Sequence, residues 1–432
     1  MIGAVNTTSL GTRRGAYLQE ADFSPAESSE RQSVAGSSSQ SRSKLRCDTI
    51  MRGARPAPFT SVRQRDDEER DRHERNSLVR ELGEGPRFMT RDTSIDIAKG
   101  IAIIAIVLGH VLRGLNSAGM IVDEVAFTRW DNALYSWHLT TFAFLSGLFV
   151  ARSSEKSGTS AYLRSRIGNF LWVYVLWSLI QGIVKIAAAG SVNSQTSPLD
   201  ILAIWRPEGQ LWFFPWIIVA TILATMIRPW IRPHGFITIA CSAVVAVGLW
   251  GYSGPVIGLQ GLALYVFYFA GTIMQADTYQ RMKIRWYLTL GAAAFYATLI
   301  AAVSFTPPTT GFENRDVMTV AAGLLTTAAG VTLVLGVSKT LAPVRQTLWL
   351  SILGRRSLEI FTAHILFTAG ARIILSKFGL HFLSVQVLAG VMFGLVGPLV
   401  LVWIMQRWTP AKLLFMAPRA ITHKSEHGLL TQ

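Results

Sequence analysis

The sequence predicts an all-α, polytopic integral membrane protein with about ten transmembrane helices, preceded by a disordered N-terminal tail. Of its 432 residues, 50% are hydrophobic and only 16% are charged. The charged fraction is well below the roughly 25% that is typical of soluble domains. Apolar runs of near twenty residues, the length needed to cross a bilayer as a helix, recur along the chain.

The first 88 residues differ from the rest in composition. They hold fifteen Lys/Arg and thirteen Asp/Glu, with runs such as SSSQSRSK and RQRDDEERDRHER. Such a segment buries too little apolar surface to fold, so we expect a disordered tail. It has no apolar core of a signal peptide and should stay in the cytosol. A second interpretation stays open, in which the natural start is Met89 and the upstream stretch is not part of the protein.

The first predicted span covers residues 95–111, and nine further runs have the length and hydropathy of a membrane helix. The span from 236 is short, so it could be tilted or re-entrant. The nine runs are 133–151, 167–189, 210–227, 236–252, 258–276, 286–305, 317–338, 357–377 and 382–406.

Basic residues predict the orientation of these spans, because Lys and Arg collect in cytoplasmic loops. They follow the second, fourth, sixth and eighth spans, at Arg152, Lys156, Arg164, Arg166, Arg228, Arg232, Arg281, Lys283, Arg285, Lys339, Arg345, Arg355 and Arg356. The loops 190–209 and 306–316 carry few charges and should lie outside. We therefore expect an inner (plasma) membrane protein with both termini cytoplasmic, a membrane domain at 89–410 and a C-terminal tail at 411–432. Because the formal net charge of +15 follows this loop pattern, it does not indicate nucleic-acid binding.

Three ionisable residues in the first span make it the candidate centre of function. Lys99 and His110 are eleven positions apart, so they differ by roughly 20° in azimuth on a helix, and Asp96 lies roughly 40° to the other side of His110. His110 should be about 16 Å deeper along the axis than Lys99. Ionisable groups inside a membrane segment are costly and usually functional. The alternative is that this helix is only a hydrophobic membrane anchor, in which the side chains of Asp96 and Lys99 extend to the polar surface of the bilayer.

Polar groups in other spans are candidate contacts for a substrate. His138 lies in YSWHLTTFAFLSGLF, Gln210 and Trp212 in GQLWFFPWII, and Glu359 and His364 in SLEIFTAHILF. The alternatives are an aromatic belt at the interface for the tryptophan and interhelical hydrogen bonds for the histidines. The two cysteines give no basis for a metal site or a disulfide framework, and no phosphate-binding loop or Gly-x-Ser-x-Gly elbow occurs.

Four stretches together resemble the membrane-bound acyltransferase-3 family, and most closely its sugar and exopolysaccharide O-acetylases. They are RDTSIDIAKGIAIIAIVLGHV, LYSWHLTTFAFLSGLFV, GQLWFF and ILGRRSLEIFTAHILF, within residues 91–406. The basic-residue-x10-His motif of the family falls on Lys99 and His110. Its Phe-His-Met-Pro-like motif is replaced by Trp137, His138, Leu139 and Thr140, so only the histidine is kept.

The resemblance implies transfer of an acyl group, usually acetyl from acetyl-CoA, to a hydroxyl of a cell-surface or lipid-linked saccharide. No permanently bound cofactor is expected. His110 would act as base or acyl relay, and Lys99, oriented by Asp96, would stabilise negative charge on the thioester side. Basic clusters at Arg164, Arg166, Arg355 and Arg356 suit the phosphates of CoA, although topology alone would also explain them. Machinery of polysaccharide biosynthesis or export would be a partner.

Two other classes of protein fit parts of the pattern. A transporter or flippase of a glycan or small molecule also places charges inside ten spans, but no internal inverted repeat, common in transporters, is evident. A structural subunit of a polysaccharide export complex would tolerate replacement of His110.

Overall fold

The computed structural model describes residues 92–188, 203–207, 209–254, 257–405, 407 and 409–422. Within these ranges the chain is helical and contains no strand. The predicted N-terminal tail and most of the loop 190–209 lie outside them. The longer helices are α2 Thr93–Ser117, α3 Glu124–Gly147, α5 Thr159–Ala187, α6 Phe213–Ile227, α7 His234–Gly248, α8 Leu264–Met274, α10 Trp286–Ala302, α11 Val317–Leu341, α13 Ser357–Lys377 and α14 Leu383–Met405. Short helices between them are α4 Val150–Ser157, η2 Gly209–Trp212, α9 Ala276–Arg281, η3 Phe312–Asn314, η4 Arg345–Thr347, α12 Leu348–Arg355, η5 Thr409–Leu414 and α15 Arg419–Thr422.

Seven of the described helical segments are long and apolar enough to cross a membrane. The other three predicted spans coincide with the shorter apolar helices α7, α8 and α10. Helix α3 starts at Glu124, nine residues before the predicted span, and its N-cap Asp123 accepts a hydrogen bond from the backbone of Ala126 at 2.9 Å. Polar residues at 124–132 hid this first part of the helix, because hydropathy detects only the apolar part.

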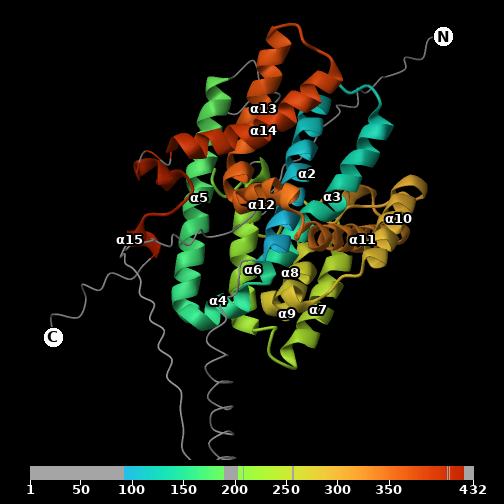
Figure 1. Ribbon diagram of the computed structural model, residues 1–432, viewed down its shortest axis with the longest axis vertical. Helices are drawn as coiled ribbons and strands as arrows, with labels where there is room; N and C mark the ends of the chain where they lie inside the picture. Colours follow the sequence, from blue (N-terminus) through green and yellow to red (C-terminus); the bar gives the residue numbers. More distant parts are fainter. Residues whose placement is uncertain are drawn as a thin grey trace, which may run out of the picture. The chain divides into compact units, whose positions relative to one another are not determined.

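Helix α2 is the element around which the others pack (Figure 1). It contacts α3, α11, α12, α13 and α14, and 72% of its most apolar window is buried, against 22% for α14. A helix buried on nearly all sides can carry polar groups only if its neighbours satisfy them. This makes α2 the place where polar residues have structural or chemical consequences.

Glycines allow two pairs of helices to cross at close range. A Cβ atom on Gly100 of α2 would lie 2.1 Å from the carbonyl oxygen of Leu350 in α12, and one on Gly354 would lie 1.8 Å from that of Asp96. Helices α3 and α8 cross in the same reciprocal way at Gly147 and Gly271. In a membrane, close contacts between small residues give the van der Waals attraction that holds helices together.

Lys339 of α11 fixes the start of α2. Its ammonium lies 3.5 Å from Asp92 Oδ2 and donates to the backbone carbonyls of Tyr279 (2.9 Å) and Gln280 (3.3 Å) in α9. Asp92 is the N-cap of α2 and accepts from the backbone of Ser94 at 2.8 Å. Burial raises the pKa of Tyr279 to about 12, so its phenol stays neutral beside this cation. One lysine thus connects three helices.

The segment after α14 packs against α5. Trp172 and Trp177 donate from Nε1 to the carbonyls of Leu413 (2.6 Å) and Leu414 (2.8 Å). The backbone of Ala417 donates to Asn169 Oδ1 at 2.9 Å. The described part of the predicted C-terminal tail therefore belongs to the helical body.

Candidate active site

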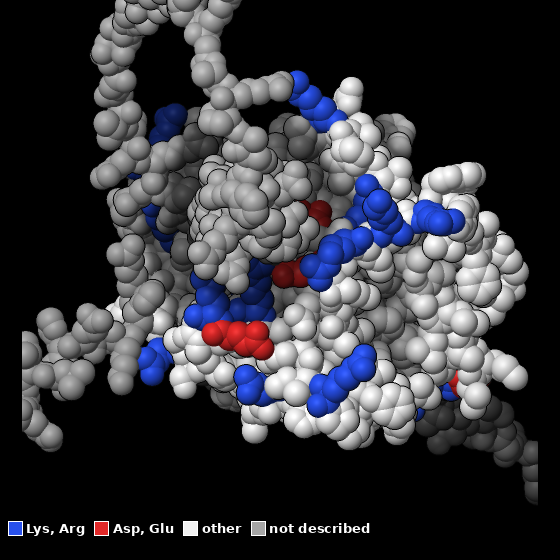
Figure 2. Space-filling view, turned by 60° about the horizontal axis from the view of Figure 1, so that its bottom comes forward, with Lys and Arg blue, Asp and Glu red and all other residues white. Residues whose placement is uncertain are grey.

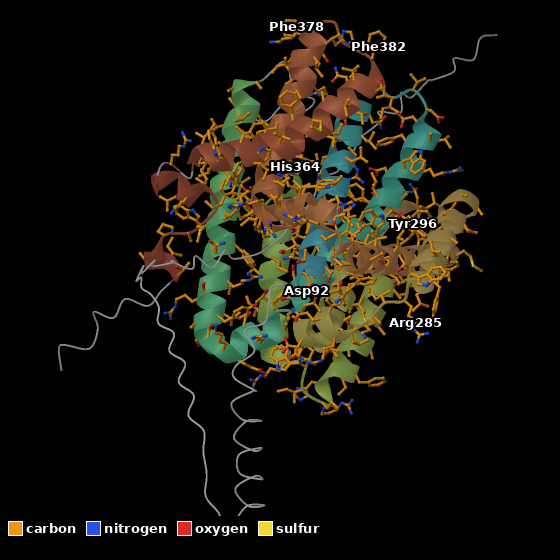
Figure 3. The ribbon with its side chains drawn as sticks, viewed as in Figure 1. Asp92, Arg285, Tyr296, His364, Phe378 and Phe382 are labelled. Carbon is orange, nitrogen blue, oxygen red and sulfur yellow. The ribbon has the colours of Figure 1, made fainter. Side chains whose placement is uncertain are left out.

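Two histidines from different helices meet in the middle of the helical body. The ring centroids of His110 in α2 and His364 in α13 are 5.0 Å apart, with a tilt of 56° between the ring planes. Figure 3 shows His364 between Asp92 and Arg285 toward one end and Phe378 and Phe382 at the other. His364 is fully buried, whereas His110 is partly exposed. The accessible imidazole of the pair is that of His110.

Backbone carbonyls of α13 determine the tautomer of His364. Its Nδ1 lies 2.7 Å from the carbonyl oxygen of Phe361 and 3.1 Å from that of Ile360. A carbonyl oxygen only accepts, so Nδ1 carries the proton, and in the neutral ring Nε2 is then an acceptor. That Nε2 atom is buried and has no hydrogen-bond partner among the residues that the structure describes.

Two glutamines from other elements bind the same turn of α13. Gln210 of η2 donates from Nε2 to the carbonyl of Phe361 at 3.5 Å, and Gln181 of α5 donates to that of Thr362 at 3.0 Å. Gln210 is fully buried, and its Oε1 has no partner. Two other elements, η2 and α5, therefore hold the turn that carries His364.

An ion pair between the partly buried Arg113 and the buried Asp131 lies one turn beyond His110. Arg113 donates from Nε to Asp131 Oδ1 at 2.8 Å and from Nη2 to Oδ2 at 2.7 Å, and its guanidinium stacks 3.4 Å from the centroid of the Tyr135 ring. The Tyr135 ring also contacts that of His138, with centroids 4.6 Å apart. His138 is buried and uses Nδ1 on the carbonyl of Leu134. His138 therefore belongs to the α2–α3 contact.

Asp96 and Lys99 lie in the N-terminal part of α2 and are both buried. Asp96 Oδ2 is 3.7 Å from Nη1 of Arg355, and Lys99 Nζ is 5.8 Å from the centroid of the Phe149 ring. The eleven-residue spacing separates Lys99 from His110 by about 16 Å along the helix. Lys99 and His110 therefore lie on the same helix but are too far apart to contact each other.

The four predicted CoA-binding arginines differ in environment. Arg164 is exposed, while Arg166 is partly buried, with its guanidinium 4.8 Å from the Phe170 ring. Arg355 binds Ser351 Oγ at 3.0 Å besides its contact with Asp96, and Arg356 pairs with Glu359 at 2.9 Å.

Figure 2 shows Lys and Arg spread over the face formed by the lower end of Figure 1, with few acidic residues between them. This face is suited to a ligand with several negative charges.

Trp212 lies in the core rather than at an interface. It is 1% exposed, its Nε1 has no partner, and its ring would overlap a Cβ atom on Gly261. The described residues contain no group of three or more His, Cys, Asp or Glu that could hold a metal ion.

The structure thus joins His110, His364 and Gln210 and separates them from Asp96, Lys99 and Glu359. Sequence reasoning missed Gln181, Arg113 and Asp131. Gln181 is a single amide in the apolar run LWVYVLWSLIQGIV, and Arg113 follows His110 by three residues. The sequence therefore contains a signal for both Gln181 and Arg113. Asp131 lies two residues before the predicted span 133–151, in the polar first part of α3.

Comparison with known proteins gives the family. Residues 92–407 match a family model described as an acyltransferase domain. The nodulation protein NolL of Sinorhizobium fredii is 27% identical over 203 residues, which are 45% of this chain and 53% of that protein. NolL of Mesorhizobium japonicum is 25% identical over 156 residues, 36% of this chain and 41% of that protein. The chain thus spans about half the length, or less, of these curated relatives. No solved structure matches.

Proposed function

The chain belongs to the acyltransferase-3 family and is an acyltransferase, and from this premise we propose that it moves acetyl from acetyl-CoA to a hydroxyl of a cell-surface or lipid-linked saccharide. The observation that carries the proposal is the placement of His110. It is the partly exposed imidazole of a pair of neighbouring histidines, and its partner His364 is fully buried.

The chemistry assigned to His110 is general base catalysis. Its imidazole removes the proton of the acceptor hydroxyl while the hydroxyl oxygen attacks the thioester carbonyl. The tetrahedral intermediate collapses with cleavage of the C–S bond, and the thiolate of CoA takes the proton from His110. The acyl group is then on the acceptor oxygen, and the hydroxyl proton is on the sulfur of CoA.

Lys99 is assigned to the donor side. At about 16 Å from His110 it lies too far away to contact the reacting carbonyl. Its cation, with Arg164, Arg166, Arg355 and Arg356, instead attracts the phosphates of CoA. His138, Trp212 and Gln210 are proposed to shape the acceptor side, whereas Glu359 pairs with Arg356 on the donor side.

A deletion strain tests the function. Mass spectrometry of its cell-surface glycans should reveal loss of an acetyl mass, which wild-type protein restores. His110→Ala should fail to restore it, because a positioned base contributes on the order of 10²–10⁴-fold. Lys99→Met should also reduce transfer, and Lys99→Arg should reduce it less. Gly370→Ala is the control, because an added Cβ atom there meets no described atom within 4 Å. Native acetylation by a normally inserted His110→Ala protein would refute the assignment of His110.

The proposed location is the inner membrane, with both termini in the cytosol and polysaccharide biosynthesis machinery as a partner. In a cysteine-free background, cysteine at Phe382 should react with an impermeant maleimide on intact cells. Cysteine at Lys283 should not react. Both side chains are exposed, so the reverse pattern would invert the orientation.

A further inference from the structure

We propose that His364 is a positioning residue that orients His110 by accepting a hydrogen bond from its ring. This inference rests on the proposed role of His110 as the base. It assigns to His364 a place behind the reacting imidazole and not on the substrate.

Burial separates the two histidines into an accessible and an inaccessible one. The Nε2 atom of His364 is closed off from solvent, so a substrate hydroxyl has no access to it in this conformation. The ring of His110 lies beside it and is partly exposed. His110 is therefore the ring that reaches substrate, and His364 can act only through it.

The distance between the rings matches a hydrogen bond. Ring nitrogens lie about 1.1 Å from the centroid of an imidazole, and an N–H···N bond is about 2.9 Å long, so two in-plane imidazoles joined by one have centroids roughly 5.1 Å apart. The observed separation is 5.0 Å. The rings are tilted by 56°, and the proposed bond has a ring nitrogen of His110 directed at Nε2 of His364.

His364 is held in the state that such a bond requires. The carbonyls of Ile360 and Phe361 keep the proton on Nδ1, which leaves the lone pair on Nε2. Gln210 and Gln181 bind the carbonyls of Phe361 and Thr362, so the turn cannot rotate away without breaking bonds to two other elements. This is the arrangement of a fixed acceptor.

The chemical consequence is control of the orientation and tautomer of His110. A ring nitrogen that donates to His364 carries the proton, so the opposite nitrogen presents its lone pair to the acceptor hydroxyl. Once His110 has taken the hydroxyl proton, the same bond stabilises the imidazolium. No atom is exchanged with His364.

Two replacements of His364 separate orientation from packing. His364→Phe keeps the ring and removes the acceptor, while His364→Gln places Oε1 near the position of Nε2. Acetyl transfer is measured with purified protein, labelled acetyl-CoA and unmodified glycan isolated from the deletion strain. Wild type and His110→Ala are run in parallel.

We expect His364→Phe to lower kcat about 10²-fold, the typical effect of a misplaced catalytic group, with the KM for acetyl-CoA unchanged within about threefold. His364→Gln should recover at least a tenth of the wild-type kcat. If His364→Phe does not fold, the His364→Gln value alone decides.

Native kcat in His364→Phe, equal losses in both variants, or a loss confined to KM would overturn the proposal. Absence of transfer by wild-type protein, or full activity of His110→Ala, would instead refute the proposed function.

Discussion

Polar side chains at the two ends of α2 have different partners from those nearer its middle. At the N-terminal end Asp92 pairs with Lys339 and Asp96 with Arg355, and at the C-terminal end Arg113 pairs with Asp131. Between them His110 lies beside a histidine whose Nε2 has no hydrogen-bond partner. This buried Nε2 atom is an acceptor that can take a hydrogen bond from a neighbouring donor.

The difference suggests that separate parts of α2 serve stability and catalysis. Paired charges at the ends hold α2 against its neighbours, and the middle is left for chemistry. Variants of Lys339, Arg113 and Asp131 should therefore lower stability without changing turnover per folded molecule. Variants at His110 or His364 should do the reverse.

The largest expected effect comes from the crossing of α2 and α12. Gly354→Ala places a methyl group 1.8 Å from the backbone oxygen of Asp96, and neither backbone can move aside alone. The helices must separate, so folded protein recovered from membranes should fall severely. Gly370→Ala is the matched control, because a Cβ atom there has no neighbour within 4 Å. Equal yields of both variants, measured by size-exclusion chromatography in mild detergent, would show that the crossing is not tight.

Breaking the pair at the other end should be the next largest effect. Arg113→Met leaves Asp131 buried without its partner, which typically costs about 3–5 kcal/mol. The double variant Arg113→Met, Asp131→Leu should recover much of that loss, because it removes both charges. Thermal unfolding of the two proteins measures the difference. A single variant as stable as wild type would mean that this pair does not hold α3 to α2.

The smallest effect is expected where Lys339 ties α11 and α9 to α2. Lys339→Met removes a partly exposed charged donor; hydrogen bonds to charged groups contribute about 1.5–3 kcal/mol, and the methionine keeps most of the packing. Unfolding free energy should fall by about 2 kcal/mol, with kcat per folded molecule unchanged. A drop in kcat at full stability would instead place Lys339 on the catalytic side of the comparison.

The sequence was sufficient to predict helices at all ten predicted spans and the three ionisable residues on α2, because hydropathy and helical spacing are local properties. It could not predict that His364 lies against His110, since this contact joins residues that are far apart in the chain. The spacing argument paired Lys99 with His110, but a shared azimuth does not bring together groups three turns apart. Short helices such as α12 were missed because their role is to supply a glycine at a crossing, which hydropathy does not register.

The contact between α5 and the segment 409–422 has a consequence for biosynthesis. Trp172 and Trp177 find their carbonyl acceptors 241 and 237 residues later in the chain. At about 5–20 residues per second, the ribosome needs roughly 10–50 s to make that interval. During this time α5 waits in the bilayer with two indole donors and the Asn169 carbonyl unmatched by these partners. A segment made about 240 residues later therefore completes α5, and the membrane insertion machinery handles an unfinished helix until that segment has been made.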